Sequence, residues 1–219
     1  MTTTELVEKT IHFVKKTLKG VEGGHDWFHI ERVFNNTLLI AKEERVNILV
    51  VSLAALLHDI ADPKFHKGDE SIGPRMAKDF LNSIHIDAET CKHVVLIIEN
   101  MSFKNSLEET SKSFTSKELQ VVQDADRLDA IGAIGIARAF NYGGFKNRSL
   151  YDPEISPNLD MSKEEYKNSL APTINHFYEK LLLLKDKMNT ATGRKIAEER
   201  HQYMLGYLEQ FYREWKGER

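Results

Sequence analysis

The chain has one cysteine, Cys91, among 219 residues, so it cannot form an internal disulfide bond. It also has no apolar run approaching the ~18 residues that a membrane span requires. The first residues, MTTTELVEKT, lack the basic and then apolar order of a secretory signal peptide. A lone cysteine without export or membrane signals is typical of a reducing compartment. We therefore expect a cytoplasmic protein with no membrane partner.

An excess of basic charge is missing as well. The 30 basic and 33 acidic residues give a formal net charge of −3, and neither sign forms a long run. A protein that binds a nucleic-acid backbone usually carries a basic stripe, because phosphates are neutralised by Lys and Arg. The composition therefore argues against a nucleic-acid partner. A small phosphorylated ligand stays compatible with it, since such a ligand needs only a local basic pocket.

The sequence has no convincing period-two alternation, and every long periodic segment has helical spacing. We therefore predict an all-α protein. The segment 47–60, NILVVSLAALLHDI, is apolar almost all round and should form a central, buried helix. Trp27 and Phe28 are expected to pack in the core. The predicted helices span residues 4–18, 25–44, 47–60, 69–83, 87–100, 116–140, 172–187 and 191–216.

The stretch 141–162 interrupts this helical pattern with two glycines and two prolines. A long insertion in a compact domain is usually a lid, a binding loop or a disordered segment. No repeat and no sharp domain boundary is visible elsewhere, so we predict one helical domain over residues 1–219. Its C-terminal helices, about 172–216, carry apolar faces that either close the protein's own core or serve a homodimer.

Ionisable residues occur inside two of the apolar helical segments. The pair His58-Asp59 ends the most apolar segment, and three carboxylates lie within QDADRLDAIG at Asp124, Asp126 and Asp129. Burying such groups is costly unless a cation compensates them. A divalent metal or Arg127 would do so, and solvent-exposed helix ends are the structural alternative.

Taken in chain order, these residues resemble the HD-domain metal-dependent phosphohydrolases, whose pattern is H…HD…D on an all-α core. The resemblance covers about residues 20–140 and is strongest to small stand-alone bacterial HD hydrolases, a group that includes nucleotide pyrophosphohydrolases. It implies an HD-domain helical bundle with a C-terminal helical extension. The implied metal ligands are His29, His58, Asp59 and Asp126.

Two imidazoles and two carboxylates form a mixed nitrogen and oxygen site. Mn²⁺ is favoured, because an octahedral ion held by four protein ligands keeps positions for water and a phosphate oxygen. Fe²⁺, Co²⁺, Ni²⁺, Mg²⁺ and Zn²⁺ stay open. An alternative is a structural zinc held by His25 and His29, one helical turn apart. That alternative leaves His58, Asp59 and Asp126 unexplained.

Further residues near the motif could handle water and phosphate. Asp62, three residues beyond Asp59, resembles an acidic residue of nucleotide-hydrolysing members and would orient the attacking water. His25 would contact a substrate phosphate or the leaving group. The predicted phosphate-binding residues are Lys64, His66 and Lys67 in the loop after the HD pair, and Arg127, which resembles a basic residue that follows the last aspartate in related enzymes.

The leading hypothesis is an enzyme that releases pyrophosphate from nucleoside or deoxynucleoside triphosphates, as the resemblance implies. Three alternatives stay open. The protein could remove phosphate from nucleoside 5′-monophosphates, or it could bind metal and nucleotide as a sensor without turnover. It could also be a helical interaction module in which these residues are structural polar groups.

Overall fold

The computed structural model describes residues 1–20, 26–61, 69–101, 114–162, 165 and 168–219. Within these ranges every regular element is a helix and no strand occurs, which confirms the all-α prediction. The described part of the chain contains no helix that is both long and apolar enough to cross a membrane. The chain forms two compact units, residues 1–126 and 127–219, which meet within one helix, α6.

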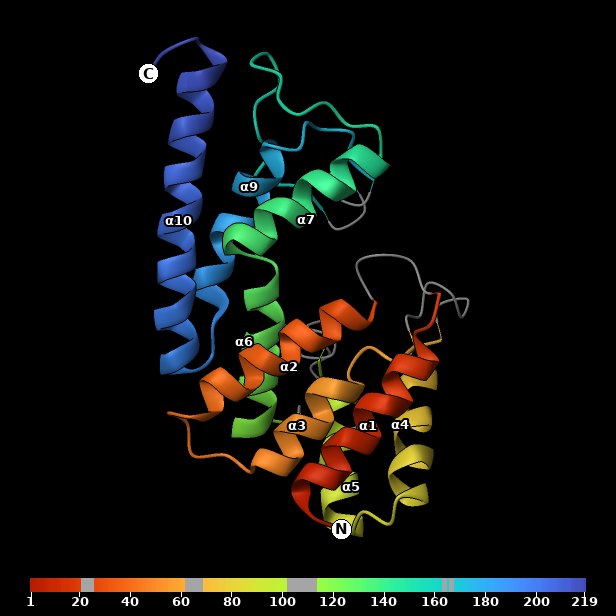
Figure 1. Ribbon diagram of the computed structural model, residues 1–219. Coiled ribbons are helices and arrows are strands. Elements are labelled where there is room, and N and C mark those ends of the chain that lie inside the picture. Colours follow the sequence, from red (N-terminus) through yellow and green to blue (C-terminus); the bar gives the residue numbers. More distant parts are fainter. Residues whose placement is uncertain (21–25, 62–68, 102–113, 163–164, 166–167) are drawn as a thin grey trace. The chain divides into compact units, whose positions relative to one another are not determined.

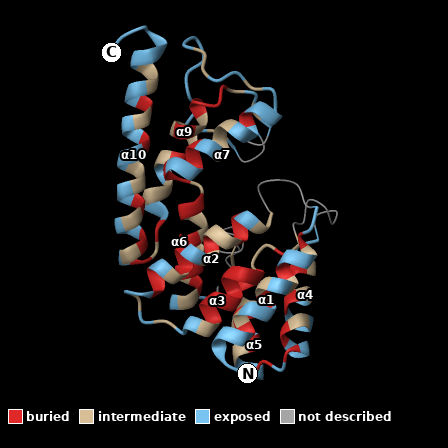
Figure 2. Ribbon diagram, in the orientation of Figure 1, coloured by how far each residue is buried: buried red, intermediate tan, exposed pale blue. Residues whose placement is uncertain are grey.

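The first unit is built around α3. This helix packs against α1, α2 and α5, while α4 packs against α5 (Figure 1). Every residue from 50 to 57 is buried, which confirms the prediction of a central apolar helix (Figure 2). The helices of this unit are α1 (Thr3–Thr17), α2 (Trp27–Ala41), α3 (Ile48–Leu57), α4 (Ile72–Ser83), α5 (Ala88–Glu99) and α6 (Lys117–Asp129), whose last three residues belong to the second unit.

The second unit is organised along its last and longest helix, α10. Both α7 and the 3₁₀ helix η3 pack against α10, and the short helix α9 packs against η3. Aromatic rings fill the contacts, with Phe177 fully buried and stacked on Tyr207 at 6.0 Å between centroids. The elements are α7 (Gly132–Phe145), α9 (Asn175–Glu179), η3 (Leu181–Lys187) and α10 (Ala191–Trp215).

Helix α2 begins two residues later than predicted. Asp26 is its N-cap and accepts a hydrogen bond from the His29 amide, so the helix starts at Trp27. The prediction that Phe28 packs in the core is wrong, because 62% of its surface is exposed. Position 28 lies on the solvent side of α2, whereas His29 and Ile30 face inward.

The predicted helix 116–140 is two helices. The first, α6, ends at Asp129, and α7 begins at Gly132. Gly132 adopts a φ of +74°, a conformation that ends a right-handed helix and that glycine reaches at least cost. The chain therefore changes direction between Asp129 and Gly132, a feature that the apolar periodicity does not reveal.

Two further boundaries differ from the predictions. The insertion predicted at 141–162 is helical up to Phe145, because α7 continues through Gly143 and Gly144. The helix predicted at 172–187 is instead α9 followed by η3, with the break at Lys180. The prediction of a single domain over residues 1–219 stays a prediction beside the two compact units.

Candidate metal centre

His29 lies in the first turn of α2, and the helix start fixes its position. Asp26 accepts a 3.0 Å hydrogen bond from the His29 amide, which is the usual action of an N-cap aspartate. Only 3% of His29 is exposed. The imidazole is therefore held by the helix terminus and by its surroundings rather than standing free in solvent.

His58 is the C-cap of α3, and one of its ring nitrogens forms a hydrogen bond within that helix. Nδ1 lies 2.9 Å from the carbonyl oxygen of Ala55. A carbonyl can only accept, so Nδ1 carries a proton and donates, and in the neutral ring the lone pair is then on Nε2. A backbone carbonyl behind a metal-binding imidazole is a common arrangement, because it fixes both the tautomer and the ring orientation.

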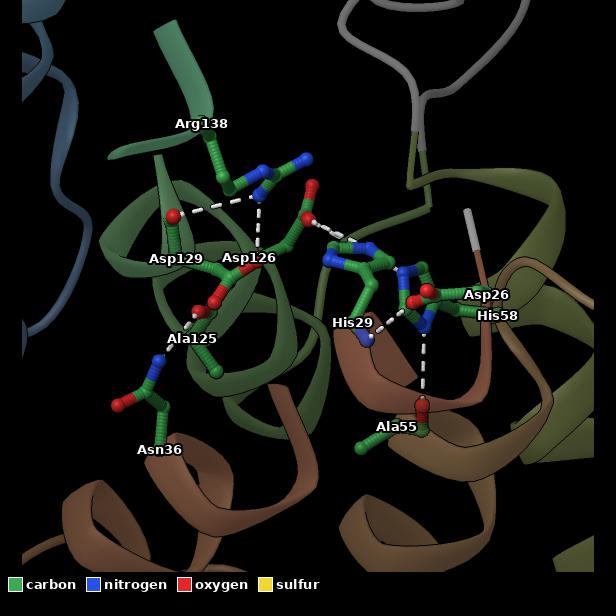
Figure 3. A network of polar contacts seen from close by, with 9 residues as sticks. All are labelled: Asp26, His29, Asn36, Ala55, His58, Ala125, Asp126, Asp129 and Arg138. Carbon is green, nitrogen blue, oxygen red and sulfur yellow. Dashed lines mark hydrogen bonds and ion pairs between the residues drawn. The ribbon is translucent and has the colours of Figure 1, made fainter. Parts of the chain in front are cut away.

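Asp126 approaches both imidazoles from α6. Its Oδ1 lies 3.5 Å from Nε2 of His29 and 4.0 Å from Nε2 of His58, and Figure 3 shows the three side chains turned toward one another. The adjoining stretch of α6 is tied to α2, since the side-chain amide of Asn36 donates to the carbonyl of Ala125 at 3.2 Å. The Asp126 side chain is 43% exposed, so the group opens toward solvent on the carboxylate side.

These three residues fit a divalent ion. Their ligand atoms all lie within 4.8 Å of one another, and both histidines offer Nε2 to the same carboxylate oxygen. Donors about 2.1 Å from an octahedral ion stand about 3 Å apart when adjacent and about 4.2 Å apart when opposite. The observed separations of 3.5 and 4.0 Å fall within this range. One ion could therefore reach all three donors with small adjustments.

The fourth predicted ligand, Asp59, directly follows His58 and is half-buried, but it is not in this three-residue group. Its role as a ligand stays a prediction. Arg127 follows Asp126 and donates to the carbonyl of Lys187 at 2.9 Å, so phosphate binding by this side chain also stays a prediction. The other predicted site residues lie outside the described residues: His25, Asp62, Lys64, His66 and Lys67.

Several supporting residues escaped the sequence analysis. Asp26 could have been found, because an aspartate directly before the first apolar residues of a helix is a standard N-cap signal. Asn36 and Arg138 had no such signal, because the partner of Asn36 is distant in sequence and a helix break separates Arg138 from Asp129. Arg138, and not only the predicted Arg127, offers positive charge here, because it donates to the carboxylate of Asp129, which is 1% exposed (Figure 3).

Comparison with known proteins identifies the family. The HD domain model matches residues 27–131. An HD-superfamily hydrolase from Bacillus thuringiensis is 45% identical, with a TM-score of 0.79 over 98% of this chain and 99% of its own. Bacillus subtilis YpgQ is 38% identical over 94% of this chain and 91% of its own length. The structure of YpgQ in complex with ADP gives a TM-score of 0.77 at 36% identity, covering 98% and 97% of the two chains. This chain therefore belongs to the HD-domain family and is an HD-superfamily hydrolase of the metal-dependent phosphohydrolase type.

Proposed function

We propose that the protein is a pyrophosphohydrolase that converts nucleoside and deoxynucleoside triphosphates to the monophosphate and pyrophosphate. The observation that carries this proposal is the convergence of His29, His58 and Asp126 on one small volume. A nucleotide ligand is supported by YpgQ, a relative along nearly the whole chain whose structure was solved in complex with ADP. The reaction adds one water across the bridge between the α- and β-phosphates.

In this proposal His29, His58 and Asp126, joined by Asp59, hold a divalent cation, with Mn²⁺ favoured. Such an ion supplies a bound water of lowered pKa and polarises a phosphoryl oxygen. The imidazoles would bind it through Nε2, and for the neutral His58 ring the bond from Nδ1 to the Ala55 carbonyl favours the tautomer with its lone pair on Nε2. The carboxylate of Asp126 contributes negative charge, which offsets the charge of the cation.

The remaining roles follow from the chemistry of the predicted residues. Asp62 would accept a proton from the attacking water or orient it, and His25 would contact a substrate phosphate or the leaving pyrophosphate. Lys64, His66 and Lys67 would contribute positive charge to the phosphate chain. Arg127 would add a guanidinium, which carries five N–H donors and is therefore not used up by one bond to the Lys187 carbonyl.

The test is a product analysis with Mn²⁺ present. Nucleoside and deoxynucleoside tri-, di- and monophosphates are incubated with the purified full chain, and the products are separated by ion-exchange chromatography. We expect monophosphate and pyrophosphate from triphosphates. His58→Ala and Asp126→Asn should abolish this product, because each removes a metal donor. His12→Ala, which changes an exposed histidine of α1 outside the three-residue group, should leave it unchanged.

The products also separate the competing hypotheses. Nucleoside and inorganic phosphate from monophosphates would replace the proposal with a nucleotidase activity. Mn²⁺-dependent nucleotide binding without any product would indicate a sensor. A protein that neither binds Mn²⁺ nor acts on any nucleotide would leave the three residues as structural polar groups and would refute the proposal.

A further inference from the structure

The candidate metal ligand Asp126 lies near the C-terminal end of α6, where the helix tends to fray. The last two turns of α6 carry the carboxylates of Asp124, Asp126 and Asp129. A helix C-terminus is the negative end of the helix dipole, and its last carbonyl groups have no partner within the helix. Negative side chains there favour fraying of the final turn. Because Asp126 is one turn or less from this end, fraying would displace its carboxylate.

Two arginines from later helices hold the final turn of α6. Arg138, in α7, donates from one nitrogen to both the carboxylate and the carbonyl oxygen of Asp129, the carbonyl at 3.2 Å (Figure 3). Arg200, in α10, donates to the carbonyl of Leu128 at 2.5 Å. Leu128 and Asp129 are 0% and 1% exposed. The guanidinium groups therefore bind terminal carbonyls that water reaches poorly.

The turn after α6 is shaped to admit Arg200. A Cβ at Gly132 would lie only 3.0 to 3.2 Å from Cβ, Cγ and Cδ of Arg200, so the arginine stem occupies the space that another residue would fill. Burial lowers the pKa of the Arg200 guanidinium, and the carboxylate of Asp129 opposes this effect. Placing a half-buried cation here is costly, and Asp129 supplies the compensating charge.

We propose that Arg138 and Arg200 are positioning residues for Asp126. By keeping the last turn of α6 helical, they hold the Asp126 carboxylate close to His29 and His58 before a metal binds. Neither arginine touches the metal or the substrate in this proposal, since both act through the continuous backbone of α6. The inference rests on the proposed function, because it assumes that a metal binds at these three residues.

The test measures Mn²⁺ binding to the full chain by electron paramagnetic resonance of the free ion. Arg138→Met and Arg200→Met keep the aliphatic stems and remove the guanidinium groups. We expect each to weaken Mn²⁺ binding by about 10-fold or more, as loss of an outer partner of a metal ligand typically does. Arg138→Lys keeps a charged nitrogen that can donate to both Asp129 oxygens, so it should bind within about 3-fold of wild type.

A second readout follows the helix itself. Without metal, hydrogen exchange of the amides in residues 126–131 should be faster in both methionine variants than in wild type and near normal in Arg138→Lys. Phe177→Leu is the matched control, since it removes fully buried packing against Tyr207 of α10 in the same unit and changes no residue of α6, Arg138 or Arg200. It should lower stability while leaving Mn²⁺ affinity and this local exchange unchanged. If Arg138→Met does not fold, Arg200→Met carries the test.

Each other outcome overturns the inference in a recognisable way. If wild type binds Mn²⁺ and both Arg138→Met and Arg200→Met bind it with the same affinity, the two arginines do not position Asp126. The proposed function would remain intact. Equal weakening in Phe177→Leu would mean that affinity follows general stability. No Mn²⁺ binding by wild type would remove the metal site, and the positioning role would fall with it.

Discussion

A histidine ring has two nitrogens, and at His58 they face different partners. Nδ1 donates to the carbonyl of Ala55, one turn earlier in α3, while Nε2 faces Asp126. The first bond is local, so it forms as soon as the end of α3 folds. The second partner lies on a helix distant in sequence. The residue is therefore pre-oriented by its own helix before the remaining ligand atoms come together.

A different histidine, His176, makes stability depend on pH. Its pKa is lowered from 6.5 to about 4, first by burial and then by the positive charges of Lys180 and Arg148. The unfolded chain therefore gains a proton below pH 6.5 that the folded protein takes up only near pH 4. Stability is fully present above pH 6.5 and falls as the pH drops to about 4. The loss from this group is at most about 3 kcal/mol.

The measurement is urea unfolding at a series of pH values from 7 to 4. In His176→Gln the free energy of unfolding should fall less steeply than in wild type across this interval, because the titrating group is gone. His12→Gln, an exposed histidine in α1, should follow wild type. Parallel curves for wild type and His176→Gln would contradict the assignment.

At the scale of elements, the junction between α6 and α7 depends on close backbone packing. The chain turns at Ala130 and Ile131, and Gly132 takes a positive φ. Gly135 then passes the carbonyl of Ala130 so closely that a Cβ would lie 2.3 Å from the oxygen. The obstacle is backbone, which cannot rotate away as a side chain would. Gly132 is therefore needed for its φ and for the space that Arg200 fills, and Gly135 for its lack of volume beside a backbone carbonyl.

Replacing Gly135 by alanine should destabilise the protein. The added methyl group would overlap the Ala130 carbonyl, so the backbone must shift to make room for it. Overpacking of this kind lowers the free energy of unfolding by about 1 to 3 kcal/mol. Gly144 gives a matched control on the same helix, because a Cβ there meets no atom within 4 Å. Gly144→Ala should instead stabilise α7 by up to about 1 kcal/mol. Thermal unfolding measures both effects, and equal shifts for the two variants would contradict this account.

At the scale of the whole molecule, one helix connects the two compact units. The boundary between residues 126 and 127 falls inside α6. Melting either unit should therefore disturb the last turns of α6, where a candidate metal ligand and the arginine contacts lie next to each other. We expect a single cooperative unfolding transition for the full chain, in keeping with the predicted single domain.

Mn²⁺ should shift that transition as a whole. At 100 times its Kd, a ligand that binds only the folded state adds about 2.7 kcal/mol, which corresponds to about 5 to 10 °C in Tm for a chain of this size. Differential scanning calorimetry with and without Mn²⁺ measures the shift, EDTA should reverse it, and His58→Ala should abolish it. Two separate transitions, of which Mn²⁺ moves only one, would show that the units unfold independently.

Much of this architecture follows from local pattern. Apolar spacing predicted helices α1 to α5 to within a few residues and identified α3 as the buried centre of the first unit. The order of His29, His58-Asp59 and Asp126 pointed to the HD family, which the comparisons confirm. Local pattern was misleading at Phe28 and at the junction after Asp129, where exposure and backbone direction depend on other parts of the chain.

The sequence by itself determined the helical class and the central helix, because apolar periodicity is a local property, and it indicated the candidate metal ligands through the resemblance to the HD family. Only the tertiary structure decided which ligand atoms meet. The distances from Asp126 to two imidazoles and the pairing of Arg138 with Asp129 arise from packing and from one helix break. Contacts of this kind join residues that sequence spacing does not relate, so the folded chain alone specifies them.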